Sequence, residues 1–274
     1  MPRLDTVSFL SDYGLADEFV GVVKAVIRTI APHAVVIDIT HDIPPHDTRA
    51  GGLALARSVQ YLPSGVVLAV VDPGVGTARR AVAVEVGDDP ASVFVGPDNG
   101  LLAAAVGMAG GAGRAVSLTN DDYHLPSPGP TFAGRDVFAP AAAHMAAGVD
   151  LAAFGPELDP ESLERLAPPS SRVDDDHIHG EVVLVDHFGN VALNVSRSEL
   201  ESVGVVLGDR VQVRMGGQTW RMPFAETFAS VPTGRMVLHE DSFRLLTVAV
   251  NQGKAAERMG ARTGDPVVVS RVVD

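Results

Sequence analysis

The sequence contains no cysteine among its 274 residues, which excludes disulfides, thiolate metal sites and cysteine nucleophiles. It also lacks an apolar run of the roughly 18–20 residues that a membrane-spanning helix needs. The beginning, MPRLDTVSFLSDYG, does not resemble a secretory leader, because an acid stands within its first apolar stretch. Basic residues are outnumbered by acidic ones, 21 to 34, which disfavours binding to nucleic-acid phosphates. We therefore expect a cytoplasmic protein with a small-molecule ligand and no nucleic-acid or membrane partner.

The first half of the chain alternates strand-like and helix-like segments. Apolar runs typical of buried strands lie at 6–12, 34–40, 65–72, 81–86 and 92–98, and helical spacing occurs at 17–32, 47–63 and 100–110. The alternation predicts an α/β domain over residues 1–165, with a mostly parallel sheet and flanking helices. Asp12, Asp72 and Asp98 each follow a predicted strand, which is where ligands bind in such sheets.

A stretch rich in proline, serine and aspartate follows this domain. We predict a linker over residues 166–177, LAPPSSRVDDDH. Beyond it the chain consists of short apolar runs separated by turn residues, without long helices. This pattern predicts a smaller all-β barrel domain over residues 178–274.

The stretch VVDPGVGTARR, residues 70–80, places an acid and two arginines around a glycine turn. Its spacing is neither that of a P-loop nor that of a dinucleotide-binding turn. Glycines permit positive backbone φ, so Asp72 can turn toward Arg79 and become a fixed hydrogen-bond acceptor for water. A strand-end turn closed by a purely structural ion pair is the open alternative.

Other polar clusters carry weaker signals. His177 and His179 would share one face of a strand, as two metal ligands can, but no third ligand stands at a useful spacing, so we expect no metal. No nucleophile elbow or Ser–His–Asp set is recognisable. In TFAGRDVFAPAAAH, residues 131–144, Asp136 is expected to cap a helix, and Arg135 can pair with it.

Seven motifs together resemble one protein family along nearly the whole chain. They are FLSDYG, DITHDIPPHD, VVDPGVGTARR, GPDNGLL, TFAGRDVFAPAAAH, DHFGN and AVNQG. The chain resembles the adenosine-forming S-adenosyl-L-methionine (SAM) hydrolases, also called SAM hydroxide adenosyltransferases, which are related to SAM-dependent fluorinases and chlorinases. The resemblance implies an N-terminal α/β domain, a C-terminal barrel, and a homotrimer with SAM between neighbouring subunits.

The resemblance also implies a reaction and a set of site residues. Water or hydroxide attacks C5′ of the ribose and releases adenosine and L-methionine, without a cofactor. The catalytic positions are Asp72, Arg79 and Ala133. The substrate-binding positions are Asp12 for the ribose hydroxyls, Asp186 for the methionine amine, Ser242 for the methionine carboxylate, and Phe188, Asn190, Phe228 and Asn251 around the adenine.

At one of these positions the chain departs from the family. The family usually has TFHGRD, whereas this sequence has TFAGRD, with Ala133 in place of a histidine that completes an Asp–Arg–His set. Loss of a proton acceptor commonly costs about 10²–10⁴-fold in rate, so hydrolysis can be impaired. His124 is the candidate substitute. The alternatives are a non-catalytic SAM- or adenosine-binding protein and a SAM-dependent halogenase, although a carboxylate at Asp72 would repel a halide.

Overall fold

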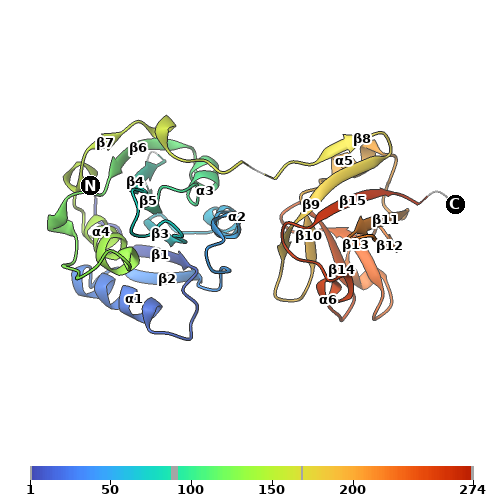
Figure 1. Cartoon of the computed structure of the whole chain (residues 1–274), viewed down its shortest axis with the longest axis horizontal. Helices are drawn as coiled ribbons and strands as arrows, with labels where there is room; N and C mark the ends of the chain where they lie inside the picture. The colour runs from blue at the N-terminus through green and yellow to red at the C-terminus, as the bar shows by residue number, and fades with distance from the viewer. Residues whose placement is uncertain (1, 88–91, 168, 273–274) are drawn as a thin grey trace. The chain divides into compact units, whose positions relative to one another are not determined.

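The computed structural model describes residues 2–87, 92–167 and 169–272. The chain forms two compact units, Met1–Leu166 and Ala167–Asp274, each with its own hydrophobic core (Figure 1). The predicted limits of the two domains stay a prediction. Within the predicted linker, residues Arg172–Asp174 form a short strand, β8, that pairs with β9 of the second unit. Among the described residues, no helix has both the length and the apolar character that crossing a membrane requires.

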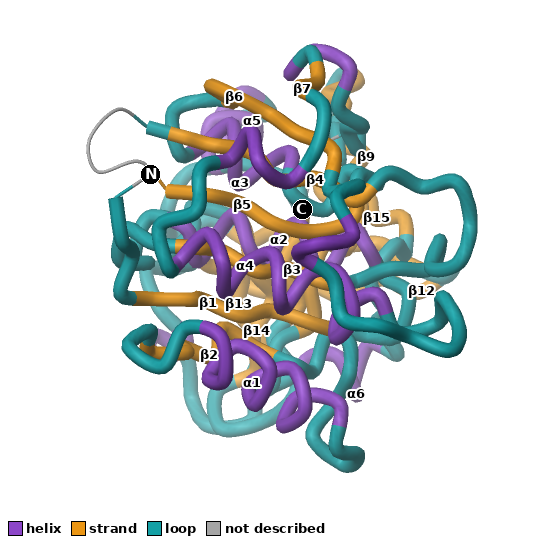
Figure 2. The backbone as a smooth tube through the Cα atoms, turned by 90° about the vertical axis from the view of Figure 1, so that its left-hand side faces the viewer, coloured by secondary structure: helices purple, strands orange, loops and turns teal. Residues whose placement is uncertain are grey.

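The first unit contains one sheet of seven strands with helices on both faces. Its strands are β1 (Thr6–Ser11), β2 (Val35–Thr40), β3 (Val66–Val70), β4 (Ala81–Val86), β5 (Ser92–Pro97), β6 (Ala112–Ser117) and β7 (Glu157–Leu158). Its α-helices are α1 (Phe19–Ile30), α2 (Thr48–Val59), α3 (Ala103–Met108) and α4 (Ala139–Ala146). The strand order is β2-β1-β3-β5-β4-β6-β7, which Figure 2 shows from bottom to top.

The sheet is parallel over β2, β1, β3 and β5, which confirms the predicted α/β class. It is mixed beyond β5, because β4 runs antiparallel to both β5 and β6. The segment between β4 and β5, residues 87–91, is too short for the crossover that a parallel pair needs, so the two strands pair as neighbours in opposite directions.

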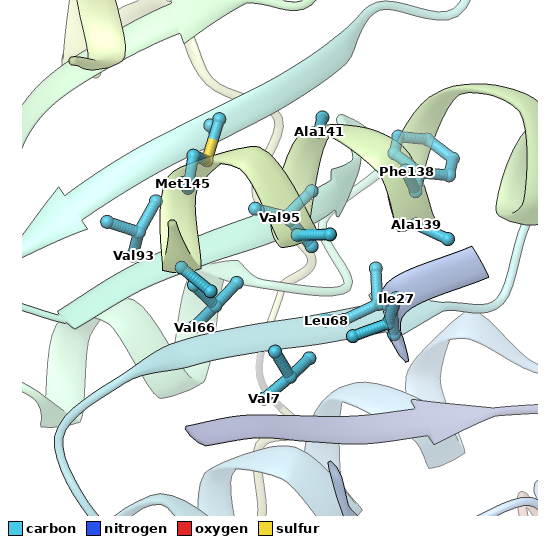
Figure 3. Packing of buried hydrophobic residues seen from close by; sticks show 14 of the residues in the cluster. Val7, Ile27, Val66, Leu68, Val93, Val95, Phe138, Ala139, Ala141 and Met145 are labelled. Atoms are coloured by element: carbon cyan, nitrogen blue, oxygen red, sulfur yellow. The ribbon is translucent and has the colours of Figure 1, made fainter. Parts of the chain in front are cut away.

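Strand β3 shows why these strands read as continuous apolar runs. Val66 and Leu68 face the core under α1 and α4, whereas Val67 and Ala69 face the core under α2 and α3. Figure 3 shows the first of these cores, where Leu68 lies near Ile27 of α1. A strand buried on both faces needs apolar residues at every position. Since β1 and β3 are parallel neighbours, the residues that follow them emerge at the same edge of the sheet.

The second unit is an antiparallel, barrel-like sheet, as predicted. Its strands are β8 (Arg172–Asp174), β9 (His177–Val185), β10 (Val191–Leu193), β11 (Arg210–Met215), β12 (Gln218–Pro223), β13 (Met236–Glu240), β14 (Leu246–Val250) and β15 (Pro266–Arg271), with helices α5 (Arg197–Ser202) and α6 (Ala255–Met259). The order is β12-β11-β15-β9-β10-β14-β13, and a bridge between Phe224 and Leu238 brings the two ends together. The barrel is therefore nearly closed, with little unpaired strand edge.

Candidate active site

Two carboxylates lie at one edge of the first sheet. Asp12 directly follows β1, and Asp72 stands two residues beyond the end of β3; Ser11 and Val70 are register partners in these parallel strands. Both acids line a cavity of about 530 Å³. The cavity is therefore at the carboxyl ends of the strands, where the sequence predicted a ligand site.

The Asp72 carboxylate is bound by the Arg79 guanidinium through two hydrogen bonds. Arg79 Nε donates to Oδ1 at 3.0 Å and Nη2 donates to Oδ2 at 2.5 Å. Arg79 Nη1 donates to the Arg80 carbonyl at 3.0 Å, and the guanidinium lies 5.2 Å from the centre of the Phe138 ring. The side chains of Asp72 and Arg79 are only 6% and 12% exposed. A bidentate pair fixed in this way holds the carboxylate in one orientation while its remaining lone pairs can accept from water.

Tyr13, next to Asp12, is a cavity residue that the sequence analysis did not single out. Burial, and after it the charges of Asp12 and Asp72, raises the pKa of Tyr13, so its phenol stays neutral. A Cβ on Gly134 would lie 2.0 Å from the Tyr13 hydroxyl oxygen, so this close approach requires glycine at that position. The only available signal was the position of Tyr13 inside the FLSDYG motif.

Asp12 is held by the backbone of a second segment. Its Oδ2 accepts a hydrogen bond from the His46 backbone N–H at 2.9 Å. His46 has φ of 68°, in the left-handed region that few non-glycine residues adopt. Strain of this kind persists only where surrounding contacts determine it, so the His46 backbone is fitted to Asp12.

Ala133 lines the same cavity at the beginning of a helix. A π-helical turn, Gly134–Phe138, follows Ala133 and leads directly into α4. The prediction that Asp136 caps this helix is wrong: Asp136 lies within the turn and accepts two hydrogen bonds from Arg135, at 2.5 and 2.9 Å. The helical conformation thus begins at Gly134, two residues before Asp136, so Asp136 cannot be its cap.

A second cavity, of about 970 Å³, shares Ala133 with the first. Arg79 and His124 also line it, and His124 Nδ1 lies 3.2 Å from Asp121 Oδ1. His124 and Ala133 therefore border a common space on the Arg79 side of the ion pair.

The third predicted acid, Asp98, has a structural environment. It follows β5 at the same sheet edge, but Arg80 Nε donates to its Oδ2 at 2.7 Å and the Glu164 N–H donates to its Oδ1 at 2.8 Å. It lines a different cavity, of about 310 Å³. Asp98 thus joins the end of β5 to the segment that leaves the first unit.

The predicted residues of the second unit lie on its barrel, which is described by itself. In the turn between β9 and β10, Asp186 accepts from the Asn190 backbone N–H and from its side-chain amide, both at 2.8 Å. Asn251, at the end of β14, lies near this turn, because β14 pairs with β10. Its side-chain amide donates to the Val231 carbonyl at 2.7 Å.

Three predicted barrel residues are surface residues. Phe188 is 72% exposed and Phe228 is 52% exposed, and Ser242 is exposed in the turn between β13 and β14. That turn is at the opposite end of β14 from Asn251, roughly 16 Å away for five extended residues. The barrel alone therefore does not bring its predicted residues to one point.

Within 2–87, 92–167 and 169–272, no group of three or more histidine, aspartate or glutamate side chains could hold a metal ion. His177 and His179 lie on β9, which pairs with β15. His177 is opposite Ser270 and His179 is opposite Val268.

Comparison with known proteins identifies relatives over the whole length. Protein-family models for the SAM hydroxide adenosyltransferase N-terminal and C-terminal domains match residues 7–155 and 180–268. An (R)-S-adenosyl-L-methionine hydrolase from Salinispora tropica is 46% identical, over 96% of this chain and 97% of its own length. A fluorinase from Actinoplanes sp. is 28% identical, over 97% of each chain. The crystal structure of an uncharacterized conserved protein from Thermotoga maritima is 37% identical, with a TM-score of 0.87, and the match covers 97% of this chain and 100% of that one.

Proposed function

Because the chain belongs to the SAM hydroxide adenosyltransferase family, we propose that it is an enzyme that hydrolyses SAM to adenosine and L-methionine. The observation that carries the proposal is the buried Asp72–Arg79 pair on the wall of a cavity that Asp12 also lines. The fluorinase relative is much less similar than the hydrolase relative, at 28% against 46% identity.

The proposed reaction is a displacement at the ribose C5′ carbon. A C5′–O bond to water forms as the C5′–S bond breaks, and the electron pair of the broken bond neutralises the sulfonium of SAM. The leaving group is the neutral thioether of methionine, so the chemistry requires no metal or cofactor. What the protein must supply is one water molecule, in line with the C5′–S bond, and exclusion of others.

In this proposal Asp72 and Arg79 position the water. The carboxylate accepts a hydrogen bond from the water and takes up or passes on its proton, while the guanidinium keeps the carboxylate in place. The same charge opposes a halide: like charges 4 Å apart repel by roughly 4 kcal/mol at an effective dielectric constant of about 20. Asp72 therefore favours hydrolysis over halogenation.

Asp12 and the barrel residues bind the substrate in the same proposal. Asp12 holds the ribose hydroxyls and so keeps C5′ in place for attack. Asp186 and Ser242 bind the methionine amine and carboxylate, and Phe188, Asn190, Phe228 and Asn251 surround the adenine. A homotrimer, in which the barrel of one subunit completes the site of its neighbour, is part of the proposal, and a cytoplasmic location stays a prediction.

The name of the Salinispora relative specifies the R configuration at sulfur. We extend this to the present chain, since in-line displacement depends on where the sulfonium substituents are placed. In a mixture of the two sulfonium epimers, the R epimer should be consumed and the S epimer should remain.

The test is incubation of the protein with SAM in ¹⁸O-labelled water, with products identified by mass spectrometry. We expect adenosine that carries ¹⁸O in its 5′-hydroxyl, together with methionine. A 5′-halogenated adenosine formed in the presence of chloride or fluoride would assign the chain to the halogenase branch. Binding of the R epimer of SAM without product over hours would favour the non-catalytic alternative, which the alanine at position 133 keeps open.

A further inference from the structure

The stretch DITHDIPPHD, residues 38–47, has no role in the proposed reaction, yet it contacts the Asp12 segment at both of its ends. Near its start, the His41 carbonyl accepts a hydrogen bond from the Gly14 N–H at 2.8 Å. Near its end, the His46 N–H donates to Asp12 at 2.9 Å. The stretch is therefore a support against which the residues after β1 are fixed.

His41 also connects two side chains within the protein. Its Nδ1 lies 2.8 Å from Ser11 Oγ, and its Nε2 lies 3.2 Å from Asp38 Oδ1. Ser11 and His41 are buried, at 0% and 4% exposure, and the His41 ring lies 4.6 Å from the Phe9 ring. A Ser–His–Asp chain is thus present, with Ser11 and His41 buried and Asp38 at the surface, although none was recognised in the sequence. Ser11 cannot be a nucleophile, because no substrate can reach a fully buried hydroxyl.

The directions of these hydrogen bonds follow from the ionisation of Asp38. Partial burial opposes ionisation, but hydrogen bonds from Lys24 and His41 outweigh it and lower the pKa of Asp38. The carboxylate can only accept, so His41 donates through its Nε2–H, and the Nδ1 of a neutral ring accepts. The Ser11 hydroxyl then donates to Nδ1 and is free to accept from the Tyr13 N–H, 3.4 Å away.

This arrangement fixes the backbone on both sides of Asp12. Ser11 precedes Asp12, and Tyr13 and Gly14 follow it; all three are bound directly or through Ser11 Oγ to His41. Lys24 Nζ, 2.6 Å from Asp38 Oδ2, anchors the far end of the chain of hydrogen bonds on α1. A shift of the backbone that carries Asp12 would require at least one of these bonds to break, and the carboxylate itself is held by the His46 N–H.

We propose that His41 is a positioning residue that orients the Asp12 carboxylate toward the ribose hydroxyls of the bound nucleoside. The inference rests on the proposed function, since it takes Asp12 as the ribose ligand. In this proposal His41 does not touch the substrate. It affects recognition of the 2′- and 3′-hydroxyls only through Asp12.

The test compares the affinities of two ligands, adenosine and 2′,3′-dideoxyadenosine, by calorimetry on the intact protein. The wild type should bind adenosine roughly tenfold or more tightly, because a hydrogen bond to a charged group is lost in the dideoxy compound. His41→Phe should lose most of this ratio while its affinity for dideoxyadenosine stays the same. His41→Asn should retain most of it, since the asparagine Oδ1 can occupy the place of Nδ1 and accept from Ser11.

Two further variants keep the test decisive. Ser11→Ala removes the hydroxyl that links His41 to the Asp12 segment, so it should lower the affinity ratio as His41→Phe does. It provides the same test if His41→Phe does not fold. His33→Phe, at a histidine bonded to the Ala146 carbonyl, should keep the wild-type ratio. If the protein hydrolyses SAM but His41→Phe and Ser11→Ala both keep the wild-type ratio of adenosine to dideoxyadenosine affinity, only the positioning role of His41 is overturned. A wild type that neither hydrolyses SAM nor distinguishes the two ligands would overturn both proposals.

Discussion

The two units differ in how far their candidate residues are exposed. In the first unit, Asp72 and Arg79 are buried and bound to each other, and Asp12 is held by the His46 backbone. In the barrel, Phe188 and Phe228 are more than half exposed. The first arrangement is held by contacts within its own unit, whereas the second presents apolar rings on the surface of its unit. Substitution of Asp72 should therefore affect rate and stability, whereas substitution of Phe188 should affect affinity with little change in stability.

The largest expected effect is on turnover, from Asp72→Asn. The amide retains the shape of the carboxylate but loses its charge and its ability to take up a proton from water. Turnover of SAM should fall by about 10³-fold, within the usual range for loss of an acid–base group, and SAM affinity should change by only a few-fold. Single-turnover kinetics and calorimetry measure the two separately.

Asp98→Asn is the matched control for this substitution. Asp98 is also buried and paired with an arginine, Arg80, but it lies outside the Asp72 cavity. Both variants should unfold at lower denaturant concentrations, because a guanidinium loses its charged partner. Only Asp72→Asn should lose turnover, and an equal loss in both would show that the Asp72–Arg79 pair is merely structural.

The next effect is a gain, from Ala133→His. Ala133 lines the cavity with Asp72, and its φ of −57° and ψ of −29° lie in the right-handed helical region, which a histidine adopts without strain. An added imidazole can accept the proton of the attacking water, so we expect turnover to rise by about 10²-fold. Ala133→Gln, which adds a polar side chain of similar reach without a base near neutral pH, should give no such rise. A wild type already as fast as Ala133→His would instead point to another acceptor, with His124 the first to replace.

The sequence predicted those parts of the first unit that depend on local pattern. The apolar runs of β1 and β3 identified the strands, and their carboxyl ends located Asp12 and Asp72 at one edge. The glycine turn after Asp72 predicted its pairing with Arg79. These features are encoded within a few consecutive residues, so periodicity and turn chemistry were sufficient.

Features that depend on contacts between distant segments were not predictable in this way. The Tyr13 hydroxyl lies where a side chain on residue 134 would be, so that position must be glycine. His41 joins Ser11 to Asp38. In the sequence, nothing in the neighbourhood of any one of these residues indicates its partner. Asp98 follows a strand just as Asp12 and Asp72 do, yet Arg80 and the backbone of Glu164 engage it. Spacing cannot show which acid at a sheet edge will find a structural partner.

A smaller effect should separate affinity from stability in the barrel. Phe188→Ala removes a ring that is 72% exposed, so the free energy of unfolding should stay within about 0.5 kcal/mol of the wild type. If the ring stacks on adenine, SAM affinity should fall about tenfold, since base–aromatic stacking contributes about 1–3 kcal/mol. Val173→Ala, at another exposed apolar residue of this unit, should change neither quantity. Unchanged SAM affinity in Phe188→Ala would remove Phe188 from the adenine site.

The smallest effect concerns the stability of the barrel at acid pH. Glu199 is part of a capping box at the start of α5, where it accepts from the Ser196 N–H at 2.7 Å. Burial alone would raise the pKa of Glu199, but hydrogen bonds from Ser171 and Ser196 outweigh it and lower the pKa. A carboxyl with a depressed folded-state pKa stabilises the fold above its ordinary value of 4.5, and this stabilisation is lost as pH falls through the folded-state pKa.

Glu199→Gln should therefore cost about 1 kcal/mol at pH 7, the typical contribution of a helix cap, and the difference from wild type should shrink below pH 4.5. Trp220, the one tryptophan of the chain, packs against the barrel core, so its fluorescence during urea unfolding reports this unit. Glu201→Gln, which removes an exposed pair with Arg197, should change stability by less than about 0.5 kcal/mol. A Glu199→Gln difference that stays constant down to pH 3 would mean that the capping box acts through shape alone, whereas a difference that shrinks below pH 4.5 would show that the charge of Glu199 stabilises the barrel.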